Sequence, residues 1–308
     1  MRIFHTLAII ATLAILQETE VFCFALETET MLPLKPTRRM SFTVREGTWM
    51  SLDVSPDGLN IVFDLLGDLY TLPIQGGKAR RITSGMAFDS QPRYSPDGRW
   101  IVFTSDRSGV NDIWLISTEN GELRRLTRSK GDAYYISPAW TPDSSAIIVA
   151  KQPSSKSYVS TLVQIGVATR AETEIPVSVN PLTSEPTSKE RLGPFVTADG
   201  RYIYASEDIS HPREAYGYWS LVRIDRSTGT LTRQTSARLG GTGMRPQISP
   251  NNRYLVYGRS NGSYVGIMLR DLRTDEERWL VPMAFRPVSW WWGGVAARSS
   301  ARICIYTG

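Results

Sequence analysis

The chain has 308 residues, of which 41% are apolar and 21% are charged, and its formal net charge is +5. These proportions are those of a globular protein and exclude a disordered chain. The positive charges are interspersed with acidic ones and form no basic run, so the sequence argues against a nucleic-acid-binding surface. Only Cys23 and Cys304 are present, which excludes a disulfide framework for the core and leaves packing to stabilise the fold.

Residues 1–25 are predicted to be a signal peptide. Arg2 precedes an apolar run at 6–16, which is too short to cross a bilayer but is typical of an export signal. Cys23-Phe24-Ala25 has the small residues that favour cleavage after Ala25, and the residues before Cys23 do not fit a lipoprotein signal. We therefore expect a periplasmic or secreted protein, with no membrane span in the mature chain.

A turn motif recurs through the rest of the chain. Its copies are Ser55-Pro56-Asp57-Gly58, Ser95-Pro96-Asp97-Gly98, Thr141-Pro142-Asp143-Ser144, Thr197-Ala198-Asp199-Gly200 and Ser249-Pro250-Asn251-Asn252. Proline presets φ at the second turn position, aspartate or asparagine binds nearby backbone amides, and glycine accepts a left-handed conformation. One copy indicates only a turn, but five copies at intervals of about 40 to 56 residues indicate an internal repeat.

Short β-rich runs follow each turn in a constant order. The first runs are 60–63, 100–103, 146–149, 202–205 and 254–257, and the second runs are 68–72, 112–116, 218–222 and 265–269. Polar and often Arg-rich runs close the units at 79–83, 123–127, 231–235 and 277–280, with the degenerate third unit ending near 173–176. With a strand leading into each turn, these runs predict four antiparallel strands per unit. The arginines suit an outermost strand, where charge prevents edge-to-edge aggregation.

Four-stranded units of this length predict an all-β protein that folds as a β-propeller. A β-sandwich is the main alternative, but it does not explain five repeats in register. We expect the propeller at 49–282, with blades at about 49–85, 86–129, 130–178, 190–237 and 244–282. Residues 26–48 are expected to form an N-terminal extension, in which 37–48 supply a possible closing strand.

Residues 283–308 are expected to form an atypical tail rather than part of a native blade. They contain Trp290-Trp291-Trp292, no acidic residue and no turn motif. We hypothesise that the tail arises from a shifted reading frame or a premature stop. Translating the other frames of the coding DNA tests this, because the hypothesis requires the blade pattern or a His-x-His pair to reappear there.

The second repeat resembles the WD-like repeats of TolB-like β-propellers. A whole repeat is matched by Phe88-Asp89-Ser90-Gln91-Pro92, Ser95-Pro96-Asp97-Gly98, Phe103 to Gly109, Asp112-Ile113-Trp114 and Arg125-Leu126-Thr127. The resemblance covers residues 40–282 in outline and implies six blades, one more than the repeats found here. The stretch from Glu46 to Asp89 is similar to the N-terminal propeller of exported amidohydrolases, in which a metal-dependent hydrolase barrel follows the propeller.

The amidohydrolase likeness implies a partner domain, but none of that domain's metal ligands can be matched here. Its metal site needs a His-x-His pair and further His and Asp ligands. This chain has only His5, inside the predicted signal peptide, and His211. We therefore predict no catalytic residue, metal ligand or cofactor in these 308 residues, whereas a longer parent would be a metal-dependent amidohydrolase.

Three features that suggest other sites are better explained by structure. Gly258-Arg259-Ser260-Asn261-Gly262 fits the G-x-S-x-G nucleophile pattern, but a strand follows and no His lies downstream, so we predict a hairpin. His211 lies in a predicted insertion in the fourth blade and is expected to be solvated. The aromatic residues on predicted strands are expected to pack between blades. They are Tyr94, Tyr134, Tyr135, Trp140, Trp219 and Tyr257.

The loops that enter the innermost strands are the predicted binding surface, because in a propeller they surround one mouth of the central channel. The predicted binding residues are Phe88, Asp89, Ser90, Tyr134 and Tyr135. Two functions stay open. The chain is expected to be a non-catalytic scaffold or substrate gate that belongs to a C-terminal hydrolase domain of amidohydrolase type. Alternatively, it is a stand-alone periplasmic TolB-like module that binds a protein partner.

Overall fold

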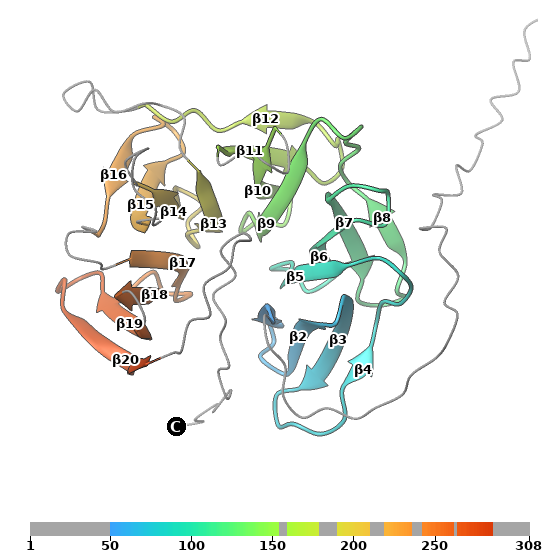
Figure 1. The fold of residues 1–308 in the computed structure, drawn as a ribbon, viewed down its shortest axis with the longest axis horizontal. Coiled ribbons are helices and arrows are strands. Elements are labelled where there is room, and N and C mark those ends of the chain that lie inside the picture. The colour runs from blue at the N-terminus through green and yellow to red at the C-terminus, as the bar shows by residue number, and fades with distance from the viewer. Residues whose placement is uncertain are drawn as a thin grey trace, which may run out of the picture. The chain divides into compact units, whose positions relative to one another are not determined.

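The computed structural model describes residues 50–153, 159–178, 190–209, 219–235, 242–261 and 264–285, all within one compact unit that spans residues 31–308. All regular secondary structure in these ranges is β-strand, and the strands form five four-stranded antiparallel sheets. The sheets follow one another around a common axis (Figure 1). This is the predicted propeller of four-stranded blades.

Each blade is a meander in which consecutive strands are neighbours. Blade 1 has β1 (Leu52–Val54), β2 (Asn60–Leu65), β3 (Asp68–Pro73) and β4 (Arg80–Arg81). Blade 2 has β5 (Asp89–Tyr94), β6 (Trp100–Ser105), β7 (Asp112–Ser117) and β8 (Leu123–Arg125). Blade 3 has β9 (Tyr134–Trp140), β10 (Ala146–Gln152), β11 (Thr161–Gly166) and β12 (Glu172–Glu174). Blade 4 has β13 (Arg191–Val196), β14 (Tyr202–Asp208), β15 (Trp219–Asp225) and β16 (Leu231–Arg233). Blade 5 has β17 (Thr242–Ile248), β18 (Tyr254–Asn261), β19 (Tyr264–Asp271) and β20 (Glu277–Phe285).

Strand β20 continues to Phe285 and therefore crosses the predicted boundary of the tail at 282. The predicted boundary is wrong at this point, because pairing of β20 with β19 reaches Phe285 opposite Tyr264. The predicted signal peptide at 1–25, the extension at 26–48, His211 and the tail from 286 lie outside the described residues.

The five turn motifs form the same hydrogen bonds. The hydroxyl at the first position donates to the side chain at the third, as in Ser55 to Asp57 (2.5 Å) and Thr141 to Asp143 (2.6 Å). The same hydroxyl accepts the N–H of the first residue of the next strand, as for Asn60 (2.9 Å). Gly58 has a φ of 72°, which glycine adopts without strain. These turns fix the start of each second strand, and they lie on one face of the propeller, the turn face.

Apolar side chains of successive blades meet to form the core. Separate buried clusters join blades 1 and 2, 2 and 3, 3 and 4, and 4 and 5. Tyr94, Tyr135, Trp140 and Tyr257 belong to these clusters or pack against them, and Trp219 is buried. The prediction that the aromatic residues pack between blades is therefore confirmed for Tyr94, Tyr135, Trp140 and Tyr257, whereas Tyr134 is half-buried and belongs to none of these clusters.

The outer strands are only partly the charged edges that the sequence predicts. Arg80 and Arg81 of β4 are exposed, as expected for an edge. Arg125 of β8 instead donates to Asp112 over 2.6 Å, and the Asp112 side chain has no solvent exposure. One arginine of the second blade therefore neutralises a buried carboxylate rather than protecting an edge.

The innermost strands of blades 2 to 5 share a bulge in which a residue with positive φ precedes a buried proline. The pairs are Gln91-Pro92, Ser137-Pro138, Gly193-Pro194 and Arg245-Pro246, with φ values of 57°, 56°, 58° and 51° at the first residue. The bulge N–H groups donate to side chains of the preceding blade, from Gln91 to Asp64 (2.8 Å) and from Arg245 to Ser206 (2.9 Å). The bulges thus link neighbouring blades close to the axis.

Candidate binding site at the axial mouth

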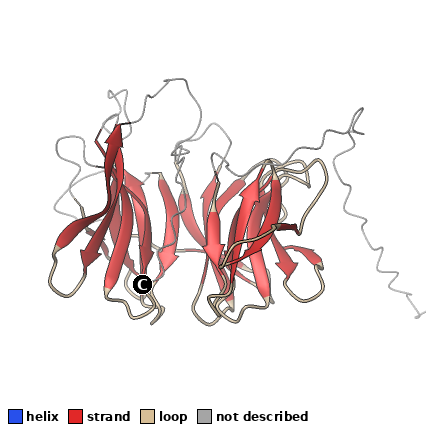
Figure 2. Ribbon diagram, turned by 90° about the horizontal axis from the view of Figure 1, so that it is seen from below, coloured by secondary structure: helices blue, strands red, loops and turns tan. Residues whose placement is uncertain are grey.

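Four of the predicted binding residues occupy two equivalent positions at the start of the inner strands, and Ser90 follows them. Pairing with β6 and β10 aligns Asp89 with Tyr135, and Phe88 and Tyr134 directly precede them. The same alignment places Glu190 and Thr242 level with Phe88 in blades 4 and 5. These residues lie at the strand ends away from the turn face, and the inner strands β5, β9 and β13 contact one another in sequence. We call this end of the axis the mouth; Figure 2 shows the strands running between the two faces.

Exposed apolar side chains gather beside the mouth in blades 1 and 2. Phe88 is 61% exposed, Met86 is 46% exposed and Leu66, in the β2–β3 turn, is 75% exposed. The Phe88 ring rests on Gly67, because a Cβ at Gly67 would lie 3.2 Å from its Cδ2 atom. The Phe88 N–H donates to the Asp106 carboxylate over 2.7 Å, which holds the loop in place. We call Leu66, Met86 and Phe88 the mouth patch.

The Asp89 side chain is buried and paired within the protein. Its side chain is 1% exposed, and Arg107 donates to both of its carboxylate oxygens at 2.6 Å. The Ser105 hydroxyl donates a further bond of 2.6 Å to Asp89. The guanidinium of Arg107 also lies over the ring of Trp114, 5.0 Å from its centroid. Asp89 therefore anchors the start of the strand that carries Phe88.

The Tyr135 side chain is also buried and bonded within the protein. Its hydroxyl donates to Glu172 over 2.7 Å, and the Lys151 ammonium lies 5.6 Å from the ring centroid. Burial and this bond to Glu172 raise the pKa of Tyr135 above its usual value. Ser90 and Tyr134 are half-buried. Of the five predicted binding residues, Phe88, Ser90 and Tyr134 thus reach solvent, whereas Asp89 and Tyr135 support the loops.

Glu190 is a mouth residue that the sequence analysis missed. Burial raises its pKa to about 7, and the negative charge of Asp208 adds to the effect, while a hydrogen bond from Gln152 (3.0 Å) opposes it. Glu190 therefore changes its charge near neutral pH. The sequence signal was its place directly before an inner strand, equivalent to Phe88 and Tyr134, which becomes visible only when the strand registers are known.

A buried ion pair supports Glu190 from the next level of the strand. Arg191 occupies the position of Asp89 two blades earlier, and its Nε donates to Glu207 over 2.7 Å. The Arg191 backbone N–H and carbonyl both bond with the Ser160 hydroxyl of blade 3 at 2.8 Å. In this pair the inner-strand residue is the base and its partner is the acid, the reverse of Asp89 and Arg107. Each ion pair therefore anchors the start of its inner strand, with the signs of the two charges reversed.

Four charged residues, Asp53, Asp64, Arg93 and Arg245, lie on strands of blades 1, 2 and 5. Asp64 accepts the N–H groups of Ser51 (2.7 Å) and Gln91 (2.8 Å), and burial raises its pKa. Asp53 accepts the N–H of Tyr94 over 2.8 Å. Arg245 is exposed, but the protein atoms around its guanidinium partly desolvate it. This desolvation lowers the pKa of Arg245, and so does the positive charge of Arg93. The positive charges of Arg93 and Arg245 favour the ionised form of Asp64 and oppose the effect of burial on its pKa.

Neither the serine motif nor a metal cluster forms a reaction centre in the described residues. Gly258-Arg259-Ser260-Asn261 lies within strand β18, and Ser260 pairs with Val265 of the following strand, so the hairpin prediction is confirmed. Within the described ranges no three His, Cys, Asp or Glu side chains are grouped so that they could hold a metal ion. No helix in the described part of the chain is long and apolar enough to cross a membrane.

Known propellers share this architecture. The family model of the tricorn protease N-terminal beta propeller domain matches residues 51–192. The structure of a putative TolB from Agrobacterium tumefaciens superposes with a TM-score of 0.62 at 19% identity, over 79% of this chain and 83% of that one. The fold is that of a TolB-like β-propeller. In this TolB-like propeller the described blades number five; all five share the turn geometry, and blades 2 to 5 share the inner-strand bulge.

Curated relatives match the TolB-like propeller over short segments. The uncharacterized protein Atu1656 of Agrobacterium fabrum is 34% identical over 93 residues, which cover 29% of this chain and 32% of that protein. The uncharacterized peptidase YuxL of Bacillus subtilis is 44% identical over 69 residues, 22% of this chain and 10% of that protein. The matches thus span less than a third of each of these relatives.

Proposed function

We propose that this propeller is a non-catalytic binding or substrate-gating domain of an exported protein, and that its mouth patch contacts a protein surface. In this proposal the surface belongs to a C-terminal hydrolase domain of a longer, amidohydrolase-type parent. The observation that carries the proposal is the exposure of Leu66, Met86 and Phe88 together beside the mouth. Large apolar side chains that are exposed as a group mark interaction sites, and aromatic residues commonly anchor them.

The charged residues at the mouth favour binding over chemistry. The carboxylates of Asp89 and Glu207 are buried and neutralised by Arg107 and Arg191, so they stabilise the strands. The hydrolase link is supported by the likeness of residues 46–89 to the propellers of exported amidohydrolases. The match to a much longer relative named as a peptidase supports a hydrolase parent more generally.

A stand-alone periplasmic TolB-like module is the second candidate. It is favoured by the putative TolB structure, of which this chain covers 83%. In that case the mouth patch contacts a separate protein. Both candidates place the contact on the same residues, so one experiment distinguishes them.

The test is site-specific photo-cross-linking of the full chain in its source cells. The photoreactive amino acid p-benzoylphenylalanine replaces Phe88 in one variant and, as a matched control, Leu59 in another. Leu59 is also exposed, at 55%, but directly follows the first turn motif on the turn face. We expect a cross-link at position 88 and none at position 59. Mass spectrometry then shows whether the captured peptide belongs to the same polypeptide or to a separate protein.

A cross-link at both positions, or at neither, would contradict the mouth as the contact surface. Export is tested in the same cells by osmotic-shock fractionation with an antibody against the propeller. We expect the protein in the periplasmic fraction or the medium, with an N-terminus directly after Ala25. Recovery with the cytoplasmic proteins would contradict export without affecting the mouth proposal.

A further inference from the structure

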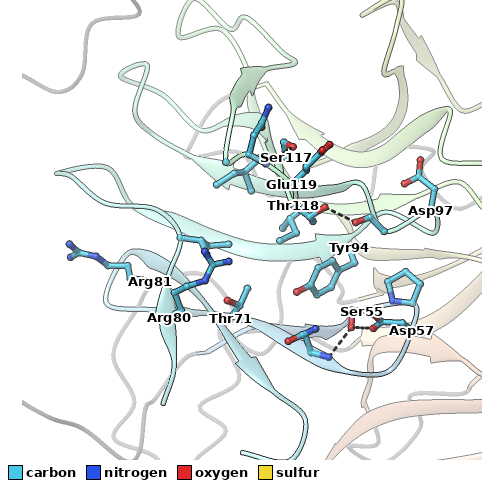
Figure 3. Close-up of a pocket in the computed structure, with 18 residues that line it drawn as sticks. Ser55, Asp57, Thr71, Arg80, Arg81, Tyr94, Asp97, Ser117, Thr118 and Glu119 are labelled. Carbon is cyan, nitrogen blue, oxygen red and sulfur yellow. Dashed lines mark hydrogen bonds between the residues drawn. The ribbon is translucent and has the colours of Figure 1, made fainter. Parts of the chain in front are cut away.

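A pocket of about 690 Å³ lies between blades 1 and 2 on the turn face, away from the mouth (Figure 3). The first two turn motifs line one side of it, and β4 with Thr71 lines the other. Tyr94, Ile82, Ile101 and Ile116 form its apolar surfaces. This volume is in the range of small-molecule sites.

The repeat explains why the pocket is open at this interface. Two positions border this pocket, and equivalent positions recur at the other blade interfaces. One lies on the third strand of the first blade. The other directly follows the third strand of the next blade, where its N–H donates across the turn. The pairs are Thr71 with Thr118, Leu115 with Val167, Gln164 with Arg226, and Arg223 with Leu272. The first pair has the smallest side chains, so it leaves space that larger residues fill elsewhere.

The equivalent groove between blades 3 and 4 is smaller and is bridged by a side chain. Its volume is about 440 Å³. Arg226 crosses it and donates to the Gln164 side chain (2.7 Å) and to the Gly200 carbonyl (2.6 Å). In the first groove the Thr118 hydroxyl bonds to the carbonyls of Gly98 (2.8 Å) and Arg99 (3.1 Å) of its own blade, and no hydrogen bond joins it to Thr71.

The first groove has opposite charge at its two ends. Arg80 and Arg81 lie at the β4 end, and Asp57 and Asp97 lie at the turn end, with Tyr94 between them (Figure 3). Glu119, in the β7–β8 hairpin, adds a third carboxylate to the lining. Hydrogen bonds from the Ser55 hydroxyl and the Leu59 N–H hold the pKa of Asp57 below its usual value, so its carboxylate is charged at neutral pH.

Two donors of this groove have no partner among the described residues. Arg81 pairs with Asp68 at 3.3 Å, whereas Arg80 forms no ion pair in the described part of the chain. The Tyr94 hydroxyl, which points toward Thr71 and Arg80 in Figure 3, also forms no hydrogen bond with any described group. Burial raises the pKa of Tyr94 to about 12, so the hydroxyl keeps its proton and can donate it in a hydrogen bond.

We propose that this groove binds a short zwitterionic peptide of one or two residues. Its carboxylate contacts Arg80 and the Tyr94 hydroxyl, its ammonium group lies against Asp57 and Asp97, and an apolar side chain packs on the isoleucines. A dipeptide separates its charges by roughly 7 Å when extended, which suits a pocket charged at both ends. This site is independent of the mouth patch and of the function proposed for it.

Calorimetric titration of the full chain with dipeptides tests the charge pattern. The probes are alanyl-leucine, its N-acetylated form, its C-amidated form and maltose as a neutral, hydroxyl-rich ligand of similar size. We expect saturable binding of alanyl-leucine with a Kd on the order of 1 mM, because exposed charges are screened by water and salt. Capping either end should weaken binding at least tenfold.

Two variants test the location. Thr118→Arg places in the first groove the residue that fills the third one, and it should abolish binding. Arg80→Ala should weaken binding about fivefold while Arg124→Ala, at the equivalent position of β8, should leave it unchanged. If Thr118→Arg does not fold, Arg80→Ala and the capped peptides still decide the outcome.

Three results would overturn the proposal. They are equal affinity for free and capped dipeptides, tighter binding of maltose than of alanyl-leucine, and unchanged affinity in Arg80→Ala. Absence of any saturable binding of the free dipeptide would do the same.

Discussion

The interface between blades 1 and 2 differs from the next two interfaces although the same strand positions form all three. Leu115 and Val167 close the second interface with apolar contacts, and Gln164 and Arg226 close the third with hydrogen bonds. Thr71 and Thr118 leave the first one open. The backbone of the repeat therefore accommodates grooves of different volume, about 690 Å³ without a bridge and about 440 Å³ with one, and the side-chain pair decides whether the groove is bridged.

The largest contrast is expected between Leu115→Ala and Thr71→Ala. Leu115 is fully buried, so its truncation leaves a cavity and should lower the free energy of unfolding by about 3 kcal/mol. Thr71 borders an open pocket, so its truncation should change the free energy by no more than about 0.5 kcal/mol. Denaturant unfolding of both variants measures the difference. Similar losses in the two variants would show that the first groove is as closely packed as the second.

Removing the bridge of the third groove should have a smaller effect. Arg226→Ala loses the bonds to Gln164 and to the Gly200 carbonyl, and we expect a loss of about 1–2 kcal/mol in thermal unfolding. The matched change Thr118→Ala in the first groove removes only bonds within one blade and should cost less. A larger loss for Thr118→Ala would reverse the assigned roles of the two grooves.

The interface between blades 3 and 4 should also depend on pH at its mouth end. Glu190 has a folded pKa of about 7, above its unfolded value, so the folded state holds the proton more tightly. Its contribution to stability is therefore complete below about pH 4.5 and is lost as the pH rises through 7. Glu190→Gln should remove this dependence and, allowing for solvent screening, gain about 1 kcal/mol relative to the wild type between pH 4.5 and 8.

Unfolding curves of the wild type and Glu190→Gln at several pH values measure this difference. A stability difference between the two proteins that does not change over this range would contradict the raised pKa. Glu172→Gln serves as a control, because Glu172 is a more distant acid of blade 3 that bonds Tyr135 and Lys151.

The smallest effect is expected from moving the third pair into the first groove. The double change Thr71→Gln with Thr118→Arg should add a bridge between blades 1 and 2 and stabilise the protein by about 0.5 kcal/mol. A double-mutant cycle with the two single variants isolates the coupling between the new side chains. A coupling of zero would mean that the two grooves differ in backbone geometry as well as in side chains.

Sequence reasoning predicted the fold well because the repeat encodes it locally. Ser55 and Asp57, and their counterparts in the other turns, form bonds within a few residues of one another, so the spacing of the motif is enough to identify them. The strands that follow are β-rich runs whose start each turn fixes. Both signals are contained in short windows of the chain.

The candidate sites were harder to predict because they depend on partners far apart in the chain. Asp89 looks like an exposed loop acid until Arg107 and Ser105 are seen around it, and Tyr135 is held by Glu172 from the outer strand of its blade. Glu190 and the pair Thr71 and Thr118 have no motif of their own. They stand out only when the bulges and registers of all blades are aligned, and a single sequence does not contain that alignment.

The inner-strand bulges have a consequence for anything that enters the axis. Each bulge proline lacks an N–H group, and Asp64, Gln91 and Ser206 already accept the N–H groups of the residues before three of these prolines. An incoming extended chain therefore cannot form a continuous ladder of backbone hydrogen bonds with the inner strands at that level. Contacts with such a chain at that level fall to side chains, which can vary while the bulge backbone stays the same.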